Sequence, residues 1–192
     1  KRLGRTTTQK KWFYVQPVVT YPSVEHHQVG AEIIDGKFED VLNSSIELLQ
    51  KLAKKPLVQV SNIMIPKILN SRYGISLDLL KSMEVESLMQ TGYPWMKDLL
   101  ELEKIEDLSS VAKKLPKDLA NELMKLKNSV SRCDYDNIVL SPLYYAKMQY
   151  YEGLTFKAFE GNDILARGGE YMDENISAAG FTIYIDEILK DF

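Results

Sequence analysis

The stretch MQYYEGLTFKAF occupies residues 148–159 and poses the main question about the fold. Two tyrosines stand beside an acid and a glycine, and apolar residues then alternate at Leu154, Phe156 and Ala158. A period of two is typical of a strand with one buried face. The stretch therefore predicts either an ordinary half-buried hairpin or one wall of a small-molecule pocket, and the rest of the chain must distinguish them.

Strand-like segments lie at both ends of the chain and helical periodicity lies between them. Helices are predicted at residues 39–55 and through most of residues 62–132, and a last helix at 186–192. Strands at the ends with helices between are typical of the α+β class, with an antiparallel or mixed sheet and flanking helices. We expect residues 1–192 to form one domain with a mainly helical insertion at about 62–132. The predicted strands are residues 12–19, 25–34, 57–61, 137–143, 145–151, 154–159, 163–169 and 178–185.

Local signals mark the ends of several elements. Gly74 is predicted to end a helix, and Ser76 and Asp186 to cap the starts of two others. Gly153 and the GND stretch at 161–163 read as turns between strands.

Composition excludes several classes of protein. The chain has 192 residues, 45% of them hydrophobic and 27% charged, with a formal net charge of -3. This balance predicts a globular protein without a nucleic-acid or membrane partner. The single cysteine, Cys133, cannot form an internal disulfide and fits a reducing, cytoplasmic setting. Because the chain begins at Lys1 rather than methionine, we expect an amino-terminal part to precede it.

Familiar catalytic and metal-binding motifs are absent from the sequence. It contains no GxxxxGK[ST] phosphate loop, no CxxC pair and no GxSxG elbow. His26 and His27 are adjacent in a predicted strand, so they should point to opposite faces and not share a metal ion. No metal or cofactor is therefore expected, and the absence of catalytic residues is an expectation that rests on the resemblance described below.

Gln28 and Glu32 form the most suggestive polar pair. Four residues apart on a strand, they should share one face, with Gly30 leaving open space between them. An amide and an acid flanking bare backbone suit a ligand with an amino group, although an exposed polar strand face is equally consistent. Taken alone, Arg167-Gly168-Gly169 favours a hairpin turn, and Tyr150 and Tyr151 favour ordinary packing.

Four segments together resemble the catalytic core of histidyl-tRNA synthetase, a class II aminoacyl-tRNA synthetase. They are WFYVQPV…EHHQVGAEII, SPLYYAKMQYYEGLTFKAF, ARGGEY and AAGFTIYIDEIL, and the resemblance covers about residues 10–36 and 134–192. It implies the class II synthetase fold. It also implies a histidine-like pocket that involves Gln28, Glu32, Tyr150, Tyr151, Gly168 and Gly169.

The arginines that the synthetase family uses for ATP and for carboxylate activation do not match. Their positions fall on Thr20, Glu187 and Ala146 in this sequence. An acid in place of an arginine repels a triphosphate. The resemblance therefore implies a protein that does not adenylate an amino acid.

A paralogous family fits this pattern, namely the regulatory subunits of short-form ATP phosphoribosyltransferase. The sequence motif YYxGxxFxA of that family resembles YYEGLTFKA at residues 150–158. The resemblance implies a non-catalytic subunit required for activity and histidine feedback in the first step of histidine biosynthesis. It also implies a catalytic-subunit partner, L-histidine as a ligand, and a homodimer within a hetero-oligomer. The alternatives are a divergent histidyl-tRNA synthetase and a synthetase-like module that senses an amino acid or binds a protein.

Overall fold

The computed structural model of the chain describes residues 10–21, 23–52, 54–145, 150–173 and 175–190. Its internal contacts divide it into two compact units. The first unit comprises Lys1–Val58 together with Phe156–Phe192, and the second comprises Gln59–Thr155. The predicted helical segment therefore falls within the second unit.

The described strands form a seven-stranded sheet in the order β1-β2-β7-β6-β5-β3-β4. The predicted α+β class is confirmed by this sheet and its flanking helices. The strands are β1 (Lys11–Thr20), β2 (Val24–Ile34), β3 (Leu57–Asn62), β4 (Ile138–Leu140), β5 (Tyr151–Glu160), β6 (Asp163–Asp173) and β7 (Ile176–Tyr184). The helices are α2 (Phe38–Lys51), α3 (Met64–Tyr73), α4 (Leu77–Ser82), α5 (Val85–Met89), α6 (Met96–Leu100), η1 (Ile105–Asp107), α7 (Leu108–Ala112), α8 (Lys117–Val130) and α9 (Ile185–Leu189).

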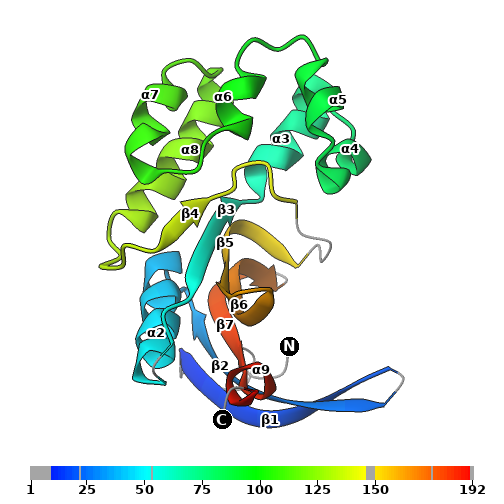
Figure 1. Cartoon of the computed structure of the whole chain (residues 1–192). Helices are drawn as coiled ribbons and strands as arrows, with labels where there is room; N and C mark the ends of the chain where they lie inside the picture. Colours follow the sequence, from blue (N-terminus) through cyan, green and yellow to red (C-terminus); the bar gives the residue numbers. More distant parts are fainter. Residues whose placement is uncertain (1–9, 22, 53, 146–149, 174, 191–192) are drawn as a thin grey trace. The chain divides into compact units, whose positions relative to one another are not determined.

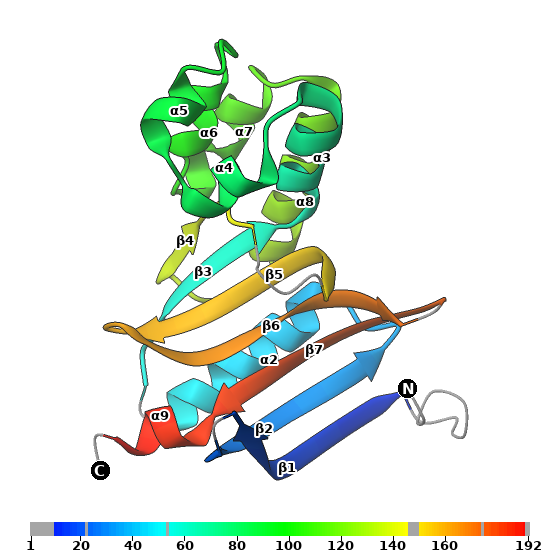
Figure 2. The same ribbon diagram turned by 90° about the vertical axis from the view of Figure 1, so that its right-hand side faces the viewer.

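In the first unit, β1, β2, β7 and β6 lie side by side and α2 crosses one face of them (Figure 2). Adjacent strands in this group are antiparallel. The core lies on the face that α2 covers, where Phe38 packs edge-to-face on Phe156 with ring centroids 6.0 Å apart. Both phenylalanines are almost fully buried. This packing leaves the opposite face of the four strands for polar residues.

The predicted strands near the amino end are confirmed, and so is their alternation. Each residue of Trp12–Val19 pairs with a residue of β2, as strand pairing requires. The odd-numbered residues of β1 point to the same face as Val29 and Ala31, and Phe13 and Val15 remain exposed there. Gln28 and Glu32 share the other face, as the period of two predicted.

Three local predictions for the first unit were wrong. Arg167-Gly168-Gly169 is no turn, because it lies inside β6 and pairs with β7. Asp186 does not cap α9: the cap position is Tyr184, and the Asp186 carboxylate instead accepts a hydrogen bond of 2.8 Å from the His27 backbone N–H. Helix α2 ends at Lys51 rather than continuing to residue 55. Its end is accompanied by a backbone hydrogen bond from Lys54 to the Leu49 carbonyl, and Pro56 disfavours helix just before it.

In the second unit, helices α3 to α8 gather together (Figure 1). The predicted caps there are confirmed: Gly74 has a left-handed φ of 69°, and the Ser76 hydroxyl accepts hydrogen bonds from the first turn of α4. Gly153 was predicted to be a turn residue, but it lies within β5. Most of the strand predicted at residues 145–151 lies outside the described residues.

Candidate functional site

The candidate site is the polar face of β1, β2, β7 and β6, on the side of the sheet away from α2. Residues opposite one another on neighbouring antiparallel strands share a face, so the register places side chains in rows. The first row holds Trp12, Glu32, Gly180 and Gly169, the second Tyr14, Gly30, Thr182 and Arg167, and the third Gln16, Gln28 and Tyr184. We call this surface the polar sheet face.

Glu32 lies over bare backbone at the first row. Its Oε2 is only 2.0 Å from the place where a Cβ on Gly180 would stand. The hydroxyl of Tyr171 donates a hydrogen bond of 2.6 Å to the same oxygen. Burial raises the pKa of the Glu32 carboxyl, while the hydrogen bond from Tyr171 acts in the opposite direction. The result is a half-buried acid held in one orientation.

Tyr14 fills the space that Gly30 was predicted to leave open. A Cβ on Gly30 would stand 2.4 Å from the Tyr14 hydroxyl oxygen. That hydroxyl is hydrogen-bonded to Thr182 Oγ1 at 2.6 Å. Burial raises the pKa of Tyr14, and the nearby Glu32 charge adds to the rise. The glycine therefore serves the close packing of a tyrosine, and the expectation of a gap there was wrong.

Arg167 and Tyr184 lie at the other end of the polar sheet face. The guanidinium carbon of Arg167 lies 5.1 Å from the centroid of the Tyr184 ring, which is a cation–π distance. Burial raises the pKa of Tyr184, and the Arg167 charge opposes this rise. Among the described residues, the buried Nε of Arg167 and the buried Nε1 of Trp12 have no hydrogen-bond partner. Two unpartnered donors thus belong to residues of this one face.

The two glycines predicted for the pocket point to different faces of the sheet. Gly169 is opposite Gly180 in the row of Glu32. Gly168 faces the core, where an added Cβ would stand 2.5 Å from the Phe156 ring. Bare backbone at residue 169 thus borders the polar sheet face, and bare backbone at residue 168 serves core packing.

The predicted tyrosine pair belongs to the second unit. The rings of Tyr150 and Tyr151 contact each other edge-to-face with centroids 5.5 Å apart. Half of Tyr150 is exposed, and Tyr151 begins β5. The predicted set is therefore divided, with Gln28, Glu32, Gly168 and Gly169 in the first unit and the tyrosines in the second.

The adjacent histidines converge on one carboxylate. His26 Nδ1 and His27 Nδ1 each lie 3.5 Å from an oxygen of Asp186, although the two residues occupy consecutive, alternating positions of β2. The backbone hydrogen bond from His27 is the main cause that lowers the pKa of Asp186.

Within the described ranges, no three His, Cys, Asp or Glu residues gather as a metal site. Nor does any helix described there have the length and apolarity to cross a membrane.

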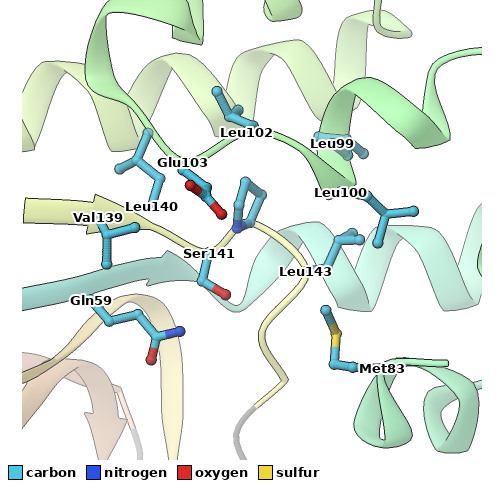
Figure 3. Close-up of a pocket in the computed structure, with 11 residues that line it drawn as sticks. Gln59, Met83, Leu99, Leu100, Leu102, Glu103, Val139, Leu140, Ser141 and Leu143 are labelled. Atoms are coloured by element: carbon cyan, nitrogen blue, oxygen red, sulfur yellow. The ribbon is translucent and has the colours of Figure 1, made fainter. Parts of the chain in front are cut away.

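A separate hollow of about 270 Å³ lies within the second unit (Figure 3). Leucines from α6, β4 and the segments that follow them contribute to its lining, and Gln59, Glu103 and Ser141 supply polar groups. Its volume is at the lower limit for a drug-sized ligand. The sequence motifs did not predict this hollow.

Sequence reasoning missed most of the residues that shape the polar sheet face. Tyr14, Tyr171, Thr182 and Tyr184 read as ordinary strand residues, and Arg167 read as part of a turn. Alternation could have put Tyr14 on the face of Gln28 and Glu32 once β1 and β2 were paired. The other residues required the register of β6 and β7, which no local pattern reveals.

Comparisons with known proteins lead to the same families as the sequence motifs did. Residues 4–188 match the sequence model of the histidyl-tRNA synthetase family. Two curated proteins, each named ATP phosphoribosyltransferase regulatory subunit, are 37% identical over 191 residues (Wolinella succinogenes) and 38% identical over 192 residues (Helicobacter hepaticus). Both alignments cover 99% of this chain. The chain belongs to the family of ATP phosphoribosyltransferase regulatory subunits. It spans 66% and 68% of the lengths of these two relatives, or about two thirds.

Solved structures agree on the fold. A Bacillus halodurans ATP phosphoribosyltransferase regulatory subunit/histidyl-tRNA synthetase matches with a TM-score of 0.77 and 18% identity, over 97% of this chain and 59% of that chain. An ATP phosphoribosyl transferase (HisG:HisZ) complex from Thermotoga maritima matches with a TM-score of 0.70 and 16% identity, over 95% of this chain and 76% of that chain. The predicted class II synthetase-like fold is confirmed.

Proposed function

We propose that this protein is a regulatory subunit that activates a short-form ATP phosphoribosyltransferase catalytic subunit in the cytoplasm and conveys histidine feedback to it. The observation that carries the proposal is the identity of 37% and 38%, along almost the whole chain, with two proteins that bear the regulatory-subunit name. Identity at this level over this length supports a shared role more strongly than a shared fold does.

The absence of catalysis is supported by the residues that stand at the synthetase's arginine positions. Thr20 is the last residue of β1, and Ala146 lies outside the described residues. Glu187 lies in the first turn of α9 and accepts a hydrogen bond from Lys190. An acid that is already paired with a lysine offers no attraction to a triphosphate.

The proposed partner is supported by the Thermotoga maritima structure, which is a complex of two kinds of subunit. We propose a short-form catalytic subunit as the partner here, with this protein forming a homodimer within the assembly. We also propose L-histidine as a ligand, on the basis of the resemblance and of the polar groups of each unit. The residues proposed to bind it are Gln28, Glu32, Tyr150, Tyr151, Gly168 and Gly169.

The test is reconstitution of the full-length protein with the short-form catalytic subunit from the same organism. We expect one co-sedimenting species in analytical ultracentrifugation and a rise in the turnover of the catalytic subunit. Two independent species at micromolar concentration, with unchanged turnover, would refute the proposal. Such a result would favour the amino-acid-sensing module as the alternative.

A further inference from the structure

Arg167 lies on the polar sheet face in the row next to that of Glu32. It is opposite Thr182 on β7, whereas Glu32 is opposite Gly180, two residues along the same strand. Two residues of strand correspond to a rise of about 7 Å. The acid and the guanidinium therefore belong to neighbouring rows of one face and not to opposite sides of the sheet.

The guanidinium of Arg167 has no acidic partner in the part of the chain that the structure describes. It contacts the Tyr184 ring at 5.1 Å, and its buried Nε–H meets no acceptor there. Burial of an N–H donor without an acceptor is unfavourable, and an arginine fork is suited to a carboxylate. Two other cations of this unit are paired, Lys10 with Asp35 and Lys190 with Asp163.

Other groups in the row of Arg167 and in the row beyond it are neutral and polar. The hydrogen-bonded hydroxyls of Tyr14 and Thr182 lie in the row of Arg167, and Gln28 is opposite Tyr184 in the next row. An acid, hydroxyls, an amide and a guanidinium on one face match a small zwitterion with a nitrogen-bearing end and a carboxylate end.

We propose that Arg167 binds the carboxylate of an amino acid whose basic, nitrogen-bearing side chain pairs with Glu32. This inference rests on the proposed function, in which the ligand is histidine, and it names the residue that recognises the carboxylate. Arg167 thereby supplies a cation to the site. The positions at which the synthetase family has arginines are occupied here by Thr20, Ala146 and Glu187. The ligand class is an amino acid with a basic side chain. The corresponding amine, which lacks the carboxylate, is a weaker ligand.

The test compares L-histidine with histamine, which lacks only the carboxylate, by calorimetric titration into the full-length protein alone and in its complex. The variants are Arg167→Ala, Arg167→Lys and, as a matched loss of one positive charge, Lys10→Ala. For Arg167→Ala we expect about 10- to 100-fold weaker binding of L-histidine and a change within about twofold for histamine. Arg167→Lys should recover only part of the loss, because lysine keeps the charge without the planar fork. Lys10→Ala should bind both ligands as the parent does.

Each other outcome is decisive as well. Equal losses for both ligands would mean that Arg167 only supports the sheet, and unchanged L-histidine binding would place the carboxylate elsewhere; either result overturns the inference. A parent that binds neither ligand overturns it too. The proposed regulatory role is judged separately, by activation of the catalytic subunit in the same preparation, so the two failures are distinguishable. Thermal unfolding of each variant verifies that it is folded.

Discussion

Tyr171 and Glu32 are 139 residues apart in the sequence, and the tyrosine hydroxyl donates a hydrogen bond of 2.6 Å to the glutamate carboxylate. The bond links β6 to β2 across β7, which lies between them. It holds the acid over the bare backbone of Gly180. Burial of this carboxyl group has measurable consequences for stability and for ligand binding.

The raised pKa of Glu32 predicts a pH dependence of stability. The carboxyl favours its protonated form in the folded state more than in the unfolded state, where its ordinary pKa is 4.5. Its contribution to stability is therefore fully present below pH 4.5 and is lost as the pH rises through the raised folded-state pKa. We expect Glu32→Gln to raise the free energy of unfolding at pH 7 by up to about 1 kcal/mol, after allowance for solvent screening, and less at pH 4.

Urea unfolding of the full-length protein between pH 4 and pH 8 measures this effect. Glu47→Gln is a matched control, because pairing with Lys51 lowers the pKa of that exposed carboxyl. Its substitution should therefore shift the pH dependence in the opposite direction. Identical pH profiles for Glu32→Gln and the parent would contradict the prediction.

Alanine substitutions at two glycines of neighbouring strands should have different effects. In Gly180→Ala, the new Cβ would collide with the flexible end of Glu32, 2.0 Å away. The glutamate can rotate, so we expect a loss of about 1 kcal/mol in stability and at least about 10-fold weaker binding of L-histidine. The measurements are urea unfolding and calorimetric titration.

Gly168→Ala is the contrasting change on the core face. Its Cβ would stand 2.5 Å from the Phe156 ring and 2.6 Å from the Gly180 carbonyl oxygen, and neither group can move freely. We expect a loss of about 2–3 kcal/mol in the free energy of unfolding, as for an overpacked core. Equal stability losses in the two variants would show that Glu32 does not lie over Gly180.

The replaced arginines predict that the protein does not activate an amino acid. We expect no histidine-dependent exchange of pyrophosphate into ATP by the full-length protein, because Thr20, Ala146 and Glu187 supply no cation for the phosphates or the carboxylate. A histidyl-tRNA synthetase of the same organism serves as the positive control. Exchange above the background without protein would favour a divergent synthetase.

Cys133 should react slowly with thiol reagents. Burial, followed by the charge of Asp134, raises the pKa of the Cys133 thiol to about 11, against an ordinary value of 9.0. Because the thiolate is the reactive form, we expect alkylation by iodoacetamide at pH 8 to be about 100-fold slower than for a cysteine of ordinary pKa. Labelling kinetics followed by mass spectrometry test this, with urea-unfolded protein as the reference. Equal rates in the folded and unfolded protein would show that the thiol is freely exposed.

Local sequence was sufficient for features that depend on near neighbours. The alternation of β2 placed Gln28 and Glu32 on one face, since successive strand residues point to opposite sides whatever lies beyond them. Gly74 and Ser76 were predicted correctly because helix ends are set by backbone conformation and by side chains one or two residues away. The resemblance to the family likewise required only the order and spacing of short segments.

Other features depend on contacts between segments far apart in the chain. Gly168 and Gly169 resemble a turn locally, but packing against Phe156 and pairing with β7 hold them in a strand. Tyr14 covers Gly30, and Tyr171 reaches Glu32, because the strand register brings these residues together. A shift of one residue in that register would turn each side chain to the other face, so only packing of the whole sheet decides which residues join Glu32.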